Sequence, residues 1–435
     1  MKRSSKLHLM FLVLGFGSYL TYYCIVAQTN YWRKFYSNTT LTIFQMAMMC
    51  SEMVGCFVAI PLDKKFQPRI FPLLHFSVSI LVLIVIVPLR LIQNFTLRCC
   101  LTAVPIGLCA FTSSMFYPCM ISCATRVDPI LSSTLQVGVG LSSILIQAVE
   151  DVISVYFSKF DTEAEYERLL ILNAICYYIT AGIILAACFA VWFVFAHQFP
   201  QATQKAVIQS NTPLTQKVAV LEQNEQQKNG ELLEGDVVPI TEQPINYQLK
   251  KKSITRRIMP LGIALMFNYL TVTIIFPLFA LNVPSRFWAT KYNQPYSDWW
   301  SLTYLTIIML FDFSGRMLPL SKKFVDWVNT KYIIIFCYLK VVFLVLYPMM
   351  SLPKAIVENN KIVQMPFISS DVFSIICAII YAFISTILPT LGYIKYQDYL
   401  DTDEEKDKGS YILNIFLEIG MCSGSIISVA MIKVF

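Results

Sequence analysis

The sequence predicts an all-α membrane protein with eleven transmembrane helices, divided into six and then five. Hydrophobic residues make up 56% of its 435 residues and charged residues only 14%, whereas an ordinary soluble domain is about 25% charged. The mean hydropathy is +0.59. A soluble fold cannot bury that much apolar surface, so the excess must face lipid.

Eleven segments are mostly apolar over the roughly 20 residues that a membrane-spanning helix needs. The fifth segment is rich in Ser and Gly and the eighth carries charge, so these two have the lowest hydropathy. No small-residue cleavage site follows the first segment, which indicates an uncleaved first helix. The predicted spans are residues 7–27, 42–61, 70–92, 97–119, 130–150, 168–196, 257–281, 300–320, 331–350, 369–394 and 409–433.

The distribution of basic residues predicts a cytosolic N-terminus and an external C-terminus. With eleven alternating spans, 22 of the 34 Lys and Arg residues fall on the cytosolic side, 11 fall outside and Lys340 lies within a span. An excess of basic residues is typical of cytosolic loops. In this topology Asn38 lies in an external loop as part of an N-x-Thr sequon, and we expect it to be glycosylated.

A polar segment divides the chain into two predicted helical bundles. Residues 198–256 are rich in Gln, Asn and Glu and poor in aromatics, so they cannot bury a core. We expect a disordered cytosolic linker there, joining a six-helix bundle of residues 1–197 to a five-helix bundle of residues 257–435. Two bundles joined in this way are typical of transporters with pseudo-symmetric halves.

Other classes of function lack their sequence signatures. The chain has no P-loop, GxSxG or HExxH motif, so we predict that it is not an enzyme. Its three histidines and 13 cysteines show no zinc-site spacing, and we expect neither metal nor cofactor. The net charge of +7 is modest and does not indicate a nucleic-acid partner. No obligate protein partner is evident, and the expected surroundings are the lipid bilayer.

Charged residues inside the predicted spans are candidates for a solute site, because burying them in lipid is costly. Asp312 and Arg316 are four residues apart, so they share one face of the eighth span. The pair can line the solute path and hydrogen-bond a permeant, or it can be a structural ion pair that locks this helix to another. The neighbouring Gly315 allows another helix to approach closely.

Three more charged residues lie within spans. Lys340 in the ninth span is too deep to reach water easily, so we expect it to have an acidic partner, either Asp312 or Glu418. Glu418 in the eleventh span can neutralise Lys340, or it can bind and release a proton during transport. Glu52 in the second span has the same alternatives.

Tyrosines in the first span suit a planar polar solute. Tyr19 and Tyr22 each offer an aromatic face and a hydroxyl, although packing against Gly15 and Gly17 is an alternative role for them. The residues alone therefore predict a carrier of small polar organic solutes.

At these positions the chain resembles the equilibrative nucleoside transporter family. That family has an Asp and an Arg four apart in the eighth helix, with Gly before the Arg, as in residues 311–316 here. Residues 276–277 match its Phe-Pro pair in the seventh helix. Residues 138–141 are similar to its Gly-Gln-Gly-Leu run, with Val139 in place of the Gln. The resemblance covers most of the chain and implies a major-facilitator-like fold.

The resemblance also implies passage of nucleosides or nucleobases by alternating access. By analogy, the residues that contact the permeant are Tyr22, Thr112, Phe276, Asp312 and Arg316.

The chain departs from the family pattern in ways that indicate a divergent member, such as a protozoan one. Residues 21–23 replace the Pro-Trp-Asn of the first helix, and Glu418 replaces a neutral residue. We expect a facilitative or proton-coupled nucleoside or nucleobase carrier in the plasma membrane. The alternatives are a carrier of another small polar solute or a drug-like amine, and a structural or signalling membrane protein.

Overall fold

The computed structural model describes residues 3–37, 39–63, 70–127, 129–156, 162–198, 253–276, 278–358 and 361–432. Nearly all of these residues are helical, as lipid requires, because a helix satisfies its own backbone hydrogen bonds. The glycosylation site expected at Asn38 lies outside the described residues, and so does most of the predicted linker.

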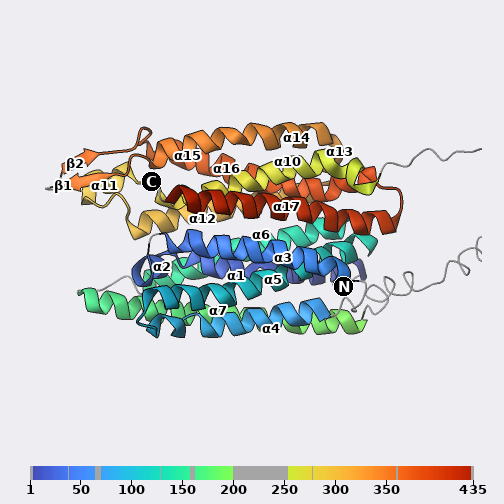
Figure 1. Cartoon of the computed structure of the whole chain (residues 1–435), viewed down its shortest axis with the longest axis horizontal. Helices are drawn as coiled ribbons and strands as arrows, with labels where there is room; N and C mark the ends of the chain where they lie inside the picture. Colours follow the sequence, from blue (N-terminus) through green and yellow to red (C-terminus); the bar gives the residue numbers. More distant parts are fainter. Residues whose placement is uncertain are drawn as a thin grey trace, which may run out of the picture.

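The N-terminal half consists of six long helices and two short ones (Figure 1). The long helices are α1 (Arg3–Ala27), α3 (Thr40–Asp63), α4 (Ile70–Val85), α5 (Phe95–Val127), α6 (Pro129–Tyr156) and α7 (Glu163–Gln198), and the short ones are α2 (Thr29–Phe35) and the 3-10 helix η1 (Pro88–Leu91).

The C-terminal half has long helices with more short elements between them. The long helices are α10 (Ile254–Ile275), α12 (Asp298–Met317), α14 (Thr330–Leu339), α15 (Phe343–Ser351), α16 (Asp371–Lys395) and α17 (Asp403–Ile432). The 3-10 turn η4 (Lys340–Val342) connects α14 directly to α15. The short elements are η2 (Ala280–Asn282), α11 (Arg286–Tyr292), η3 (Leu318–Leu320), α13 (Lys322–Trp327), η5 (Tyr396–Tyr399) and the antiparallel strands β1 (Ile356–Glu358) and β2 (Lys361–Gln364).

Ten helical segments of the described chain are long and apolar enough to cross a membrane. Helix α12 is not among them, because its 20 residues include Asp298, Asp312 and Arg316. It nevertheless runs beside the others along the long axis, and the two termini lie at opposite ends of that axis (Figure 1). The predicted count of eleven crossings stays a prediction.

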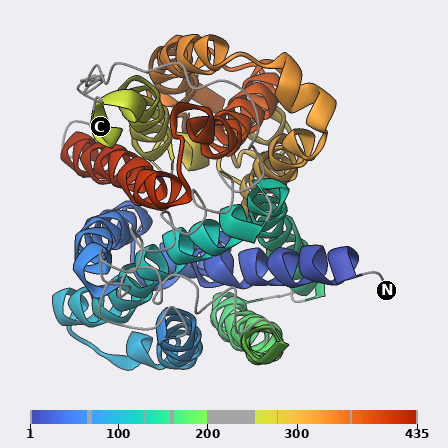
Figure 2. The ribbon, with the colours of Figure 1, turned by 90° about the vertical axis from the view of Figure 1, so that its right-hand side faces the viewer.

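The helices form two groups when the molecule is viewed along its length. Helices of the N-terminal half lie below and those of the C-terminal half lie above (Figure 2). Across the boundary α6 packs against α12 and α16, while α3 and α5 pack against α17. The interior of the protein is therefore shared between segments that are far apart in the sequence.

Glycines allow two helices of the N-terminal half to pack at very short range. A Cβ atom on Gly138 of α6 would lie 2.1 Å from the Leu12 carbonyl oxygen of α1. A Cβ atom on Gly15 of α1 would lie 2.0 Å from the Leu135 carbonyl oxygen of α6. Only glycine fits at such a backbone contact, and the Gly-rich fifth span thus serves to hold α1 and α6 together.

Candidate functional site

A cavity of about 150 Å³ lies between the two halves. A cavity needs about 10–15 Å³ of such free space to hold one water molecule, so this one has room for on the order of ten waters. Four helices of each half supply its wall, namely α1, α3, α5 and α6 with α10, α12, α16 and α17.

Tyrosines from both halves contribute to this wall. Their rings offer apolar faces and their hydroxyls offer hydrogen bonds, so the cavity can hold a flat solute that has polar edges. The lining tyrosines are Tyr19, Tyr22, Tyr23, Tyr117, Tyr269, Tyr381 and Tyr393.

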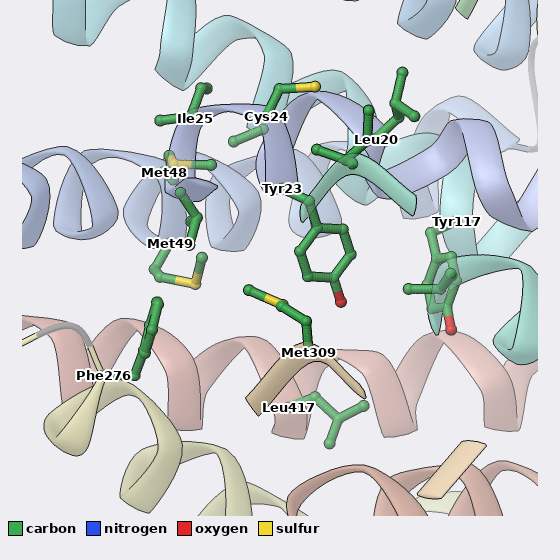
Figure 3. Close-up of a cluster of buried hydrophobic side chains, with 14 of the residues drawn as sticks. Leu20, Tyr23, Cys24, Ile25, Met48, Met49, Tyr117, Phe276, Met309 and Leu417 are labelled. Carbon is green, nitrogen blue, oxygen red and sulfur yellow. The ribbon is translucent and has the colours of Figure 1, made fainter. Parts of the chain in front are cut away.

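The apolar part of the wall is shared across the boundary as well. Figure 3 shows Tyr23 and Met49 on the side of the N-terminal half and Met309 and Leu417 on the side of the C-terminal half, with the Met309 side chain pointing toward the N-terminal half. Phe276, at the C-terminal end of α10, closes one end of this cluster. A solute in the cavity would thus touch both halves at once.

Asp312 and Arg316 place opposite charges on the cavity wall. Arg316 donates from Nε to Asp312 Oδ2 over 3.0 Å and from Nη2 to Asp312 Oδ1 over 3.3 Å. Its Nη1 donates to Gln136 Oε1 of α6 over 2.8 Å. Ser143 of α6 donates to Asp312 Oδ2 over 3.4 Å. The pair therefore lines the cavity and also joins α12 to the other half.

Two glycines fix the position of α12. A Cβ atom on Gly315 would lie 2.4 Å from Thr386 Oγ1 and 2.7 Å from the Phe383 carbonyl oxygen, both on α16. A Cβ atom on Gly140 of α6 would lie 2.8 Å from Arg316 Cδ. The charged pair is thus held between α6 and α16 by close backbone contacts.

Five of the six residues predicted to bind substrate line the cavity, namely Tyr19, Tyr22, Phe276, Asp312 and Arg316. Thr112 does not line it. The Thr112 hydroxyl donates to the Cys109 carbonyl oxygen over 2.9 Å and lies 3.3 Å from His75 Nδ1 of α4. Thr112 therefore faces the interior of the N-terminal half.

Lys340 has a different partner from the one expected. Its Nζ donates to the side-chain and backbone oxygens of Asn268, over 3.0 and 3.2 Å, and lies 5.2 Å from the centre of the Tyr381 ring. In the described part of the chain no carboxylate lies within salt-bridge distance of it, so the expected pairing with Asp312 or Glu418 is wrong. The reason is that Lys340 lies at the α14–η4 junction, which packs on α10.

Several site residues were missed by sequence reasoning. Gln136 is the acceptor for Arg316, and Tyr269, Tyr381 and Asn414 line the cavity. Each is a polar residue within a mostly apolar helix, and the sequence shows such residues directly. Which of many such residues meet at one place depends on helix packing, and one sequence does not contain that information.

Polar contacts join the two halves at the end of the molecule where α2 lies. Arg33 donates to Ser301 Oγ over 3.0 Å and to the Leu281 carbonyl oxygen over 2.7 Å. Thr306 of α12 donates to Asp151 of α6 over 2.9 Å. The basic-residue distribution predicts that this end is external, so we call these contacts the outer clasp.

No group of three or more His, Cys, Asp or Glu side chains that could hold a metal ion occurs among the described residues. The chemistry available at the cavity is stacking, hydrogen bonding and one ion pair.

Solved structures of membrane transporters share this fold. They include the major facilitator superfamily transporter FucP in its outward conformation (14% identity, TM-score 0.55, covering 100% of this chain and 92% of that one). The xylose transporter XylE from E. coli has 10% identity and a TM-score of 0.53, covering 98% of both chains. The nucleoside transporter NupG has 11% identity and a TM-score of 0.58, covering 99% of this chain and 92% of that one.

The chain thus shares the helical fold of these major facilitator transporters, and ten of its described helical segments are long and apolar enough to cross a membrane. No curated protein sequence matches the chain. The model of the nucleoside transporter family matches residues 108–433, which is most of the chain. The protein therefore belongs to the nucleoside transporter family, and the resemblance seen in its sequence is confirmed.

Proposed function

We propose that this transporter moves nucleosides and nucleobases through the tyrosine-lined cavity by alternating access. The observation that carries the proposal is the Asp312–Arg316 pair on the wall of a cavity shared by both halves. A planar base can stack on the tyrosine rings, while the carboxylate and guanidinium hydrogen-bond its ring nitrogens or the ribose hydroxyls.

The two halves are the moving parts in this proposal. We take residues 1–197 and 257–435 as two bundles that rock about the central cavity, so that the cavity opens to one side at a time. The outer clasp supports this view, because it consists of a few hydrogen bonds that lie at one end of the molecule. Each of these part-buried hydrogen bonds involves a charged group and contributes about 1.5–3 kcal/mol, so a few of them can break during a conformational change.

Uptake by the purified protein in proteoliposomes tests the proposal. We expect saturable uptake of labelled adenosine, uridine or hypoxanthine, with competition among them and none from sugars or amino acids. Arg316→Ala should abolish uptake. Arg256→Ala, which changes an exposed arginine of the same half, should not. Failure of every nucleoside and base to enter above the level of empty liposomes would refute the proposal.

A drug-like amine is a second candidate permeant. Glu52 lies on the cavity wall and forms no ion pair in the described part of the chain, so the wall has an acidic group to offer a cation. Inhibition of nucleoside uptake by organic amines, lost in Glu52→Gln, would support this candidate. We also expect the protein in the plasma membrane, which surface labelling of intact cells would test.

A further inference from the structure

Two buried glutamates lie on two helices that pack together where the halves meet. Glu52 is on α3 and Glu418 is on α17, and these helices pack together across the boundary. Two contacts fix their relative position. Cys56 of α3 lies 3.1 Å (Sγ to Nδ2) from Asn414 of α17.

The second contact is between Cys50 and Cys422, whose sulfur atoms are 3.5 Å apart. From this contact to the first one, the residue numbers rise from 50 to 56 on α3 and fall from 422 to 414 on α17. The two helices are therefore antiparallel here. Glu52 lies between the two contact residues of α3, and Glu418 lies midway between those of α17. Both glutamates therefore lie on the two helix segments that these contacts hold together.

Neither carboxyl group has its hydrogen-bonding capacity met. Each side chain is only 2% exposed, and each Oε2 lacks a hydrogen-bond partner in the described part of the chain. Glu418 Oε1 accepts one long hydrogen bond, of 3.4 Å, from Asn414. Glu52 lines the cavity, and so does Gln45, two turns earlier on the same face of α3. The Gln45 Oε1 is also buried and has no partner among the described residues.

No cation neutralises the two glutamates. Neither forms an ion pair with a Lys or Arg of the described chain, and the charged pair Asp312–Arg316 on α12 neutralises itself. The other titratable groups that face them are phenols and thiols, which are neutral at neutral pH. They are Tyr19 and Tyr22 of α1, Cys56 of α3, Cys109 of α5, Tyr269 of α10, Tyr393 of α16 and Cys422 of α17.

We propose that Glu52 and Glu418 bind one shared proton between the two halves and that this proton crosses the membrane together with the permeant. Two buried carboxylates on packed helices, with no ion pair to a cation of the described residues, can both be charged only at high cost. One bound proton removes the repulsion between two negative charges, and a protonated carboxyl group can also donate a hydrogen bond, which an ionised one cannot.

The cavity couples this proton to the permeant. A permeant that fills the cavity displaces water from beside Glu52, which disfavours the doubly charged state further and strengthens proton binding. By reciprocity, the bound proton strengthens permeant binding by the same factor. The two therefore travel in the same direction, and the proton passes to water when the cavity opens on the other side. This inference rests on the proposed function.

A pH gradient across proteoliposomes tests the inference. With one proton per neutral permeant, a gradient of one pH unit should concentrate labelled adenosine about tenfold on the alkaline side, because 1.4 kcal/mol corresponds to a factor of ten. In Glu52→Gln and in Glu418→Gln the pH gradient should no longer drive accumulation. The final internal concentration of adenosine should equal the external concentration, however slowly each variant transports.

The matched control is Glu150→Gln. Glu150 is also buried, but both of its oxygens accept hydrogen bonds, from Gln28 and Ser154. This variant should keep the tenfold accumulation. If either glutamate variant of the pair also keeps it, the proposed site is wrong.

A second measurement needs no variant. A pH indicator trapped inside proteoliposomes of the natural protein should report acidification of the interior when permeant is added outside. Permeant uptake without proton movement would overturn the inference and leave the proposed function standing. Absence of uptake at every pH would instead overturn the proposed function, and the inference with it.

Discussion

At the scale of single residues, the site depends on how Arg316 distributes its hydrogen bonds. Its planar guanidinium reaches both oxygens of Asp312 and, from a third nitrogen, the side chain of Gln136 in the other half. It is 12% exposed, and Asp312 is 14% exposed. The compact ammonium group of a lysine cannot make this planar set of hydrogen bonds from three nitrogens.

Arg316→Lys should therefore lower uptake by about tenfold or more while the protein remains folded. The loss of one charged hydrogen bond costs about 1.5–3 kcal/mol. The measurement is the initial rate of nucleoside uptake, normalised to the amount of protein in the membrane. Arg256→Lys, on the exposed surface, is the control. Full activity of Arg316→Lys would show that transport does not need the hydrogen bonds of the guanidinium group.

Lys340 leads to a prediction about stability. It is buried without a carboxylate partner, against Asn268 and the Tyr381 ring. Replacing it by Met removes the cost of burying a charge and keeps the volume. Lys340→Met should melt in detergent at the same temperature as the parent or higher. Lys291→Met, which changes an exposed lysine above two aromatic rings, is the control. A clear drop confined to Lys340→Met would mean that the contacts of Lys340 with Asn268 and Tyr381 stabilise the fold by more than burial of the charge costs.

At the scale of helices, the site depends on α12 lying between α6 and α16. Gly140 and Gly315 permit that position, because a Cβ atom at either would meet atoms at less than 3 Å. The charges on α12 kept it out of the set of helices apolar enough to cross a membrane alone. Its neighbours supply the polar contacts that lipid cannot.

Gly315→Ala should push α12 away from α16 and destabilise the protein by about 1–3 kcal/mol, the usual cost of overpacking. Thermal melting and nucleoside uptake should both decline. Gly182→Ala in α7 is the matched control, since a Cβ atom there would meet nothing within 4 Å. Equal melting temperatures for the two variants would contradict the close packing.

At the scale of the whole molecule, the outer clasp joins the halves through Arg33, Asp151 and their partners Ser301, Leu281 and Thr306. The cavity lies deeper, between the same halves. Loss of the clasp should favour opening of the cavity toward that end, since a two-state equilibrium shifts when one state loses contacts.

Arg33→Ala should accordingly expose the cavity from the external side. A cysteine placed at Met49 on the cavity wall should react several-fold faster with a thiol reagent that cannot cross the membrane. Lys34→Ala is the control, because Lys34 pairs with Glu163 and Glu167 within the N-terminal half. Identical labelling rates in the two variants would argue against a clasp at Arg33.

The sequence by itself determined the class and family of this protein. Hydropathy required membrane helices, the i,i+4 spacing put Asp312 and Arg316 on one face, and the motifs of residues 276–277 and 311–316 indicated the family. These features are local, and helix geometry alone translates them into structure.

Only the tertiary structure decided which residues meet. Membrane helices are apolar on most faces, so periodicity does not tell which side is buried. The partner of Lys340 proved to be Asn268, and Thr112 lies away from the cavity, because packing sets both. Glu52 and Glu418 are more than 350 residues apart in the sequence, and they form one site because α3 and α17 pack against each other across the two halves.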